Sequence, residues 1–132
     1  MAGDVAVVFD CGATNLRVMA VNSQGQALAS ASRRNETAPQ PQAASNEWRI
    51  WDLEEVWDKL AGACQEVCQQ LDTSRIAAVT VTTFGADGAP VRSDGTLTYP
   101  IISWQETRTQ QLSVEITELM APWEIFKRPA IR

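Results

Sequence analysis

The residues of this chain with the clearest chemical meaning lie between positions 10 and 17, at a turn between two apolar runs. Asp10 ends the first run, and a carboxylate there can hold a hydrated Mg²⁺, because this ion prefers one or two carboxylates together with water and phosphate oxygens. Gly12 permits a tight turn whose backbone N–H groups converge on an anion. Thr14 adds a hydroxyl donor, and Arg17 adds a planar cation. The segment predicts a phosphate-binding turn; an ordinary β-hairpin with a polar turn is the alternative.

Composition and charge narrow the classes of protein to which the chain can belong. Its 132 residues, 45% of them hydrophobic, are enough for one core, so we expect one domain or one lobe of a larger protein. With 11 basic and 16 acidic residues the net charge is −5, which argues against binding to nucleic acid or to an anionic membrane. No signal-peptide pattern opens the sequence and no apolar run approaches the ~20 residues that span a bilayer, so a cytoplasmic protein is expected.

Cysteine and histidine content limits the available catalytic chemistry. Three cysteines are an odd number and do not form a disulfide framework, and without histidine a zinc site is not expected. Cys64 and Cys68 lie in a helical pattern, and we interpret them as packing residues. Because histidine is the commonest general base, its absence leaves a carboxylate as the group that would accept a proton.

The first half of the chain has the pattern of a three-stranded antiparallel meander. Apolar and β-branched runs separated by turn residues cover Asp4–Asp10, Leu16–Val21 and Gln26–Ser32. The polar segment Arg34–Asn46, which contains two prolines, predicts an exposed connection that is long for a compact domain.

The second half alternates between helix and strand. Apolar side chains spaced three and four residues apart predict an amphipathic helix capped by Asp52; they are Leu53, Val56, Trp57, Leu60, Cys64, Val67, Cys68 and Leu71. We then expect a buried strand over Arg75–Thr83, a loop to Gly88, a hairpin within residues 89–103 and a helix over Gln105–Met120 that Pro122 ends. This order predicts an α/β domain with a mixed sheet and helices packed on it.

Three segments together resemble the N-terminal part of the FGGY carbohydrate kinases: Phe9–Arg17, Val79–Gly88 and Tyr99–Arg108. They occur in the order and spacing of that family, and the likeness covers about residues 4 to 120. The resemblance implies the ribonuclease-H-like lobe of actin-like ATPases, with a sheet that opens on the three-stranded meander. It also implies transfer of the γ-phosphate of ATP, with Mg²⁺, to a hydroxyl of a (deoxy)ketose such as L-fuculose.

The resemblance further implies roles for individual residues. It assigns Asp10 to Mg²⁺, directly or through water, and the terminal phosphates of ATP to Gly12, Ala13, Thr14, Asn15 and Arg17. It places four residues on the sugar side: Gly85, Asp87, Trp104 and Arg108. Structural alternatives stay open, namely a turn-stabilising role for Asp87, core packing for Trp104 and an ion pair between Glu106 and Arg108. We interpret Trp48, Trp51 and Trp57 as residues that pack in the core or in a lid.

The chain also departs from the family pattern. The general base of these kinases is an aspartate in a later Gly-x-Asp segment, and no such segment follows residue 88. We therefore expect residues 1–132 to form an incomplete N-terminal lobe, with the second lobe absent, no catalytic residue and little or no kinase turnover. Uncovered apolar surface predicts self-association. A non-catalytic nucleotide- or sugar-binding module, or an inactive remnant of the same fold, is the alternative.

Overall fold

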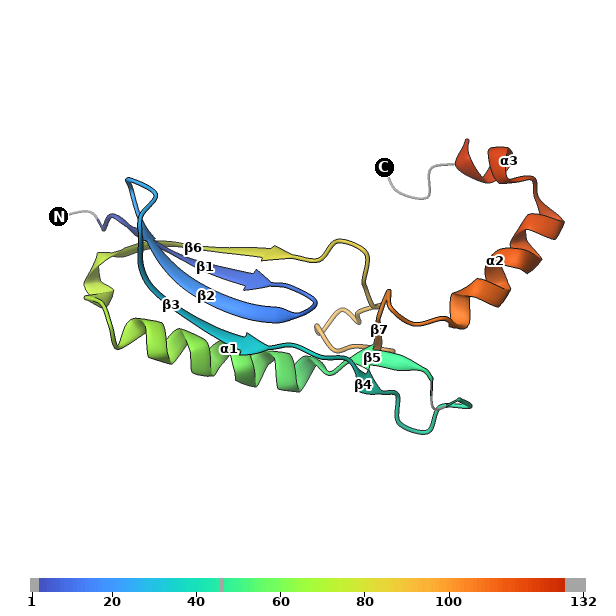
Figure 1. Ribbon diagram of the computed structural model, residues 1–132, viewed down its shortest axis with the longest axis horizontal. Helices are drawn as coiled ribbons and strands as arrows, with labels where there is room; N and C mark the ends of the chain where they lie inside the picture. The colour runs from blue at the N-terminus through green and yellow to red at the C-terminus, as the bar shows by residue number, and fades with distance from the viewer. Residues whose placement is uncertain (1–2, 46, 128–132) are drawn as a thin grey trace.

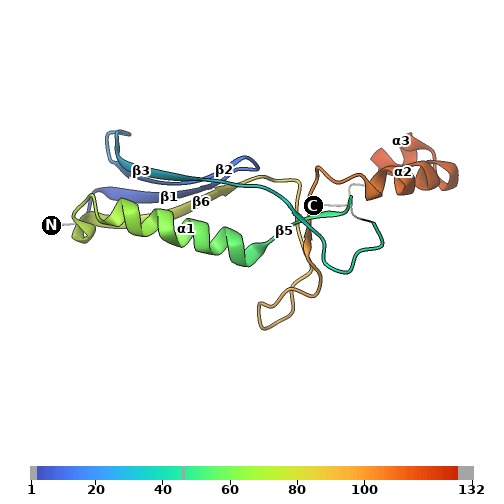
Figure 2. The same ribbon diagram turned by 60° about the horizontal axis from the view of Figure 1, so that its bottom comes forward.

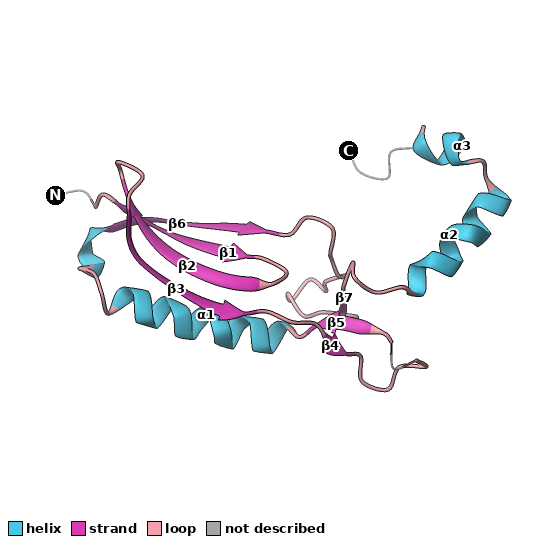
Figure 3. Cartoon of the chain, viewed as in Figure 1, coloured by secondary structure: helices cyan, strands magenta, loops and turns pink. Residues whose placement is uncertain are grey.

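The computed structural model of the protein describes residues 3–45 and 47–127. Its main sheet has four strands in the order β3-β2-β1-β6 (Figures 1 and 3). The first three strands form an antiparallel meander, and β6 runs parallel to β1 on its other side. The bounds are Val5–Cys11 for β1, Asn15–Asn22 for β2, Ala27–Arg34 for β3 and Ile76–Thr83 for β6. The predicted meander and mixed sheet are confirmed.

Helix α1 (Leu53–Cys68) covers one face of this sheet, as Figure 2 shows. The helix begins where predicted, because the Asp52 side chain accepts hydrogen bonds from the backbone N–H groups of Glu54 and Glu55. The helix and the inward-facing side chains of the meander form the core, which consists of Val5, Val7, Leu16, Val18, Ala20, Ala29, Ala31, Leu60, Ala63 and Val67. Cys64 packs against this core, as predicted.

Helix α1 covers only part of the main sheet, so the predicted burial of one strand is wrong. The sequence predicts a buried strand over Arg75–Thr83, but Val79 and Val81 of β6 each expose 64% of their surface. Both lie on the same face as α1, because they pair in register with Val7 and Phe9 of β1. The helix contacts mainly β2 and β3 and leaves the edge strand uncovered. An apolar run predicts burial only where another element packs on the strand.

A second, small sheet lies outside the sequence prediction. It has the order β4-β5-β7, with β4 at Ala38–Pro39, β5 at Arg49–Trp51 and β7 at Ile101–Ile102. β4 belongs to the segment predicted as an exposed connection, whose last residue, Asn46, lies outside the described residues. The hairpin predicted within residues 89–103 is reduced to one bridge, Val91 with Leu97, because β7 pairs with β5 instead. Strands this short show no alternating pattern.

Two helices follow the small sheet and extend away from the main sheet in Figure 1: α2 (Arg108–Leu119) and α3 (Pro122–Phe126). α2 begins at Arg108 rather than at Gln105, and the Glu106 carboxylate accepts a hydrogen bond from its first N–H at 2.5 Å. Pro122 opens α3, since a residue without an N–H fits the first turn of a helix. In residues 3–45 and 47–127, no helix is long and apolar enough to cross a membrane.

Candidate functional site

The turn between β1 and β2 depends on glycine. The backbone N–H of Gly12 donates to the carbonyl of Asn15 at 3.0 Å. A Cβ on Gly12 would lie 2.8 Å from that same oxygen, closer than side chains approach backbone atoms in proteins. A larger residue would therefore force the turn open, which agrees with the role that the sequence predicts for Gly12.

Asn35, which follows β3, fixes the carbonyl groups of this turn. Its backbone N–H donates to the Thr14 carbonyl at 2.8 Å, and its Nδ2 donates to the Gly12 carbonyl at 2.9 Å. Asn35 is only 4% exposed, so the prediction of an exposed connection is wrong here. The N–H groups of Ala13 and Thr14 have no acceptor among the described residues, and free N–H groups of successive residues bind anions. A single asparagine in a polar segment carries no pattern from which this role could be predicted.

Asp10 and Arg17 face each other across the ladder between β1 and β2, next to Thr82 of β6. Residues paired in register share a face of the sheet, so these side chains form a row on the face opposite α1. Neither the Asp10 carboxylate nor the Arg17 guanidinium makes a hydrogen bond or an ion pair with another described residue. The row therefore offers a free anion and a free cation beside the turn.

The donor set at this turn fits Mg²⁺ as a partial site. The described ranges contain no group of three or more His, Cys, Asp or Glu side chains that could hold a metal ion. Asp10 would therefore supply one ligand, and water and phosphate oxygens would supply the others, which is the arrangement that Mg²⁺ accepts.

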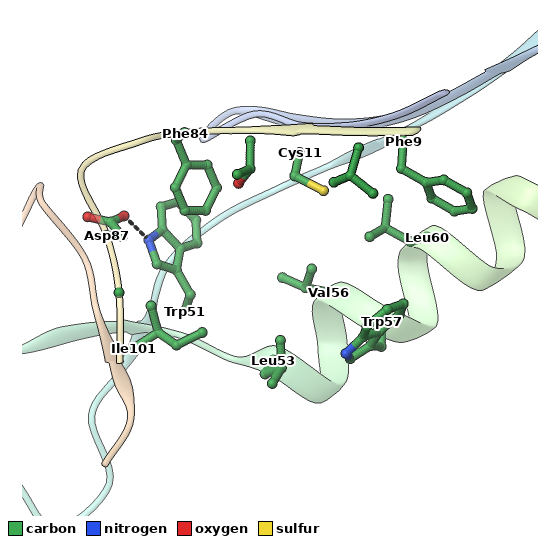
Figure 4. Close-up of a pocket in the computed structure, with 13 residues that line it drawn as sticks. Phe9, Cys11, Trp51, Leu53, Val56, Trp57, Leu60, Phe84, Asp87 and Ile101 are labelled. Atoms are coloured by element: carbon green, nitrogen blue, oxygen red, sulfur yellow. Dashed lines mark hydrogen bonds between the residues drawn. The ribbon is translucent and has the colours of Figure 1, made fainter. Parts of the chain in front are cut away.

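Cys11 faces away from this row, into the apolar cavity of Figure 4. Burial raises the pKa of its thiol, and the charge of neighbouring Asp10 raises it further. The thiol is therefore a weaker nucleophile at neutral pH than an exposed cysteine, and its role is packing. Trp57 lines the same cavity but is 62% exposed, which excludes the core alternative for this residue and leaves lid packing as a prediction.

The predicted sugar-side residues gather around the loop that follows β6. Asp87 and Trp104 line one open hollow of about 400 Å³, together with Ala86, Gly88, Ile102, Ser103 and Glu106. Trp104 is 58% exposed and so is not packed in a core within the described residues. Gly85 precedes Ala86 in the sequence and does not line this hollow, but a Cβ there would meet no atom within 4 Å. The structure thus brings two of the four predicted residues, Asp87 and Trp104, together beside open space.

Asp87 joins two of the segments around this hollow. The indole Nε1 of Trp51 donates to one carboxylate oxygen at 2.5 Å, and the backbone N–H of Trp104 donates to the other at 2.8 Å. Both contacts reach residues far away in the sequence, so Asp87 joins distant segments rather than stabilising its own turn, which is the role that the sequence left open. Trp51 is buried, as predicted.

Arg108, the fourth predicted sugar-side residue, is not among the side chains that line the hollow. Its guanidinium pairs with the fully buried side chain of Glu106 and donates to Gln40 Oε1 at 2.7 Å. It also lies over the Trp48 ring, 4.2 Å from the ring centre. The ion pair that the sequence left open is therefore present, and it ties the start of α2 to the small sheet.

The arrangement of a glycine turn with free N–H groups, an unpaired carboxylate and a nearby polar hollow can be compared with known proteins. A family model described as the FGGY family of carbohydrate kinases, N-terminal domain, matches residues 5–131. This chain belongs to the FGGY family of carbohydrate kinases. The resemblance carried by the three sequence segments is confirmed, and the FGGY family is one of ATP-dependent carbohydrate kinases.

Curated relatives of this FGGY chain include L-fuculokinases. The protein from Haemophilus influenzae is 39% identical over 132 residues, which cover 96% of this chain and 28% of that protein. The protein from Escherichia coli K12 is 40% identical over 121 residues, which cover 92% of this chain and 25% of that protein. The chain therefore spans about a quarter of the length of these relatives.

Solved structures of sugar kinases share the fold of this FGGY chain. Xylulose kinase from Lactobacillus acidophilus matches with a TM-score of 0.76 at 17% identity, over 94% of this chain and 24% of that one. Xylulose kinase from Rhodospirillum rubrum matches with a TM-score of 0.74 at 19% identity, over 92% and 25%. At these identities the likeness shows the fold, and the predicted lobe of the actin-like ATPases is confirmed.

Proposed function

We propose that this chain is the nucleotide- and sugar-facing N-terminal part of an ATP-dependent kinase that phosphorylates a (deoxy)ketose such as L-fuculose. One observation carries the proposal: the Gly12 turn presents two free backbone N–H groups beside a free carboxylate and a free guanidinium. Phosphoryl transfer depends on placement and charge neutralisation more than on covalent chemistry, and these groups provide both. The L-fuculokinases at 39% and 40% identity support the choice of sugar.

On the nucleotide side, the turn binds and orients the terminal phosphates of ATP. The N–H groups of Ala13 and Thr14 and the Thr14 hydroxyl donate to phosphate oxygens, and Asn15 closes the turn by accepting the Gly12 N–H. Arg17 offsets phosphate charge with its guanidinium. Asp10 would hold Mg²⁺, directly or through water, and the ion would supply positive charge that offsets the charge of the phosphates.

On the sugar side, the substrate lies against the open backbone at Gly85 and the exposed ring of Trp104. Asp87 and Arg108 act on this side as well, Arg108 through its ion pair with Glu106. A bond forms between the sugar oxygen and the γ-phosphorus while the bond from that phosphorus to ADP breaks. The sugar hydroxyl gives its proton to the aspartate that the FGGY resemblance implies in a later Gly-x-Asp segment, whereas the two hydrogen bonds of Asp87 engage its carboxylate in the fold.

A second candidate function is a binding module that holds nucleotide or sugar without transferring phosphate. The hydrogen bonds of Asp87 favour this function, because they engage its carboxylate in the fold. The other carboxylate among the described residues that line the hollow, Glu106, is also engaged, in its ion pair with Arg108. Incubation of the chain with ATP, Mg²⁺ and L-fuculose distinguishes the two, since only a kinase produces sugar phosphate. We expect little or no turnover from residues 1–132 alone.

Binding of Mg-ATP tests the nucleotide site directly. We expect Asp10→Asn to weaken Mg-ATP binding at least about tenfold, because the neutral amide loses the charge that attracts the metal; tenfold is ~1.4 kcal/mol. Isothermal titration with and without Mg²⁺ measures the effect. Asp58→Asn makes the same change on the exposed side of α1, and its titration curve should match that of the unaltered chain. Equal Mg-ATP affinity in Asp10→Asn would remove the proposed role of this carboxylate.

The uncovered edge of the main sheet supports a proposal of self-association. β6 has no strand beside its outer edge in the described residues, and exposed apolar strand edges pair with other chains. We expect the sedimentation coefficient to rise with concentration, and Val79→Lys with Val81→Lys to reduce that rise. Val91→Lys, at an exposed valine outside the sheet, serves as the matched control. A concentration-independent single species of the unaltered chain would contradict the expectation.

A further inference from the structure

Two cavities of different character meet at Asp87. One is the apolar cavity of about 280 Å³ between the main sheet and the start of α1, drawn in Figure 4. The other is the polar hollow of about 400 Å³ that Trp104 lines. Asp87 lines both of them. A change on the apolar side can therefore reach the sugar side through this one carboxylate.

Trp51 presents its N–H to Asp87 from a fixed position. The residue is only 3% exposed, and its ring stacks on that of Phe84 with the ring centres 5.0 Å apart and an angle of 27° between planes. Its backbone pairs with Ile101 in the small sheet. Because backbone and ring are both held, the indole N–H fixes the carboxylate of Asp87 in turn (Figure 4).

The second oxygen of Asp87 accepts the backbone N–H of Trp104, so the carboxylate links three segments that are distant in the sequence. These are β5, which carries Trp51, the loop after β6, which carries Gly85, and the segment after β7, which carries Trp104. The carboxylate thus holds the loop after β6 against the segment that carries Trp104.

We propose that Trp51 is a positioning residue for the sugar, which acts through Asp87 on the placement of Trp104 relative to the loop that carries Gly85. This inference rests on the proposed function, because it assumes that a sugar enters the hollow between this loop and Trp104. It changes the role of Asp87 from a ligand of the sugar to a support for the two groups that contact it. Specificity then depends on a tryptophan that lies on the apolar side and does not line the hollow.

The indole N–H signals of the full chain in a ¹H–¹⁵N spectrum provide a test that needs no turnover. Trp51→Phe keeps an aromatic ring for stacking and identifies the Trp51 signal by its loss. We expect Asp87→Asn to move this signal upfield, because the charged acceptor is removed. Saturation with L-fuculose should shift the signals of Trp104 and leave the Trp51 indole in place. An upfield shift of the Trp51 indole on adding the sugar would mean that the sugar takes Asp87 for itself, which overturns the inference.

Sugar affinity provides the second readout. We expect Trp51→Phe and Asp87→Asn each to weaken L-fuculose binding about tenfold, the scale of effect when positioning is lost. Trp57→Phe makes the same chemical change at an exposed ring of the same cavity and should bind L-fuculose like the unaltered chain. Circular dichroism establishes that each variant is folded; if Trp51→Phe is not, Asp87→Asn and the sugar-induced shifts carry the test.

Gly85→Ala separates failure of this inference from failure of the proposed function. Its new Cβ meets no protein atom within 4 Å, so it leaves the fold intact and obstructs only a ligand. The proposed function, and this inference with it, is contradicted if the unaltered chain does not bind L-fuculose or if Gly85→Ala binds it equally well. The positioning role alone is contradicted if Gly85→Ala abolishes L-fuculose binding and Trp51→Phe leaves it unchanged.

Discussion

Leu16→Ala lowers the free energy of unfolding by about 2–5 kcal/mol, the usual cost of removing a fully buried leucine side chain. Leu16 is 0% exposed and lies in β2, in the core between the meander and α1. Domains of this kind are stable by only about 5–15 kcal/mol, so this one change removes a large fraction of the total. Urea unfolding followed by circular dichroism measures the difference.

The control for this prediction is the same substitution at a partly exposed position of the meander. Leu28 lies in β3 and is 41% exposed. Leu28→Ala should cost less than about 1 kcal/mol, because surface substitutions remove little buried area. If both variants lowered the free energy of unfolding by the same amount, the packing of α1 on the meander would not be the main source of stability.

Asn35→Leu weakens both the fold and the nucleotide site. Leucine has a similar size but no donor, so the Gly12 carbonyl loses its partner at a buried position, at a cost of about 1–3 kcal/mol. The turn is then free to rotate its peptide groups, and we expect Mg-ATP affinity to fall about tenfold as its N–H groups lose their common direction. Thermal unfolding and isothermal titration measure the two effects separately.

Gln65→Leu is the matched control, since it replaces an exposed amide on α1 whose side chain bonds to no other described residue. Its stability and its Mg-ATP affinity should stay close to those of the unaltered chain. Loss of stability in Asn35→Leu without loss of Mg-ATP affinity would show that Asn35 supports the fold and does not orient the turn.

Much of the fold could be predicted because its main elements have strong local patterns. The meander shows apolar runs divided by turn residues, and α1 shows both a helical apolar spacing and a capping carboxylate at Asp52. The turn between β1 and β2 could also be predicted, because Gly12 lies between two apolar runs. Phosphate binding at this turn, which the residue types at Asp10, Gly12 and Arg17 favour, stays a prediction.

The remainder depends on contacts between distant segments, which no local pattern encodes. Asn35 lies in a polar stretch, yet its two hydrogen bonds reach back to the turn after β1. Trp51 and Asp87 are 36 residues apart and meet only because β5 joins β7. The burial of β6 was predicted from its composition, whereas its exposure follows from where α1 packs. Pairing and packing partners, rather than residue types, decided these features.

The edge position of β6 makes the two halves of the site unequal in local stability. β1 and β2 each have a hydrogen-bonded strand on both sides, whereas β6 has one only on the side of β1 in the described part of the chain. Amide protons should therefore exchange with solvent more slowly in β1, before the Gly12 turn, than in β6, before the Gly85 loop. Under the proposed function, the phosphates of a nucleotide would bind at the more rigid of the two strand ends, and the sugar would bind at the less rigid one, which the contact between Trp51 and Asp87 helps to hold.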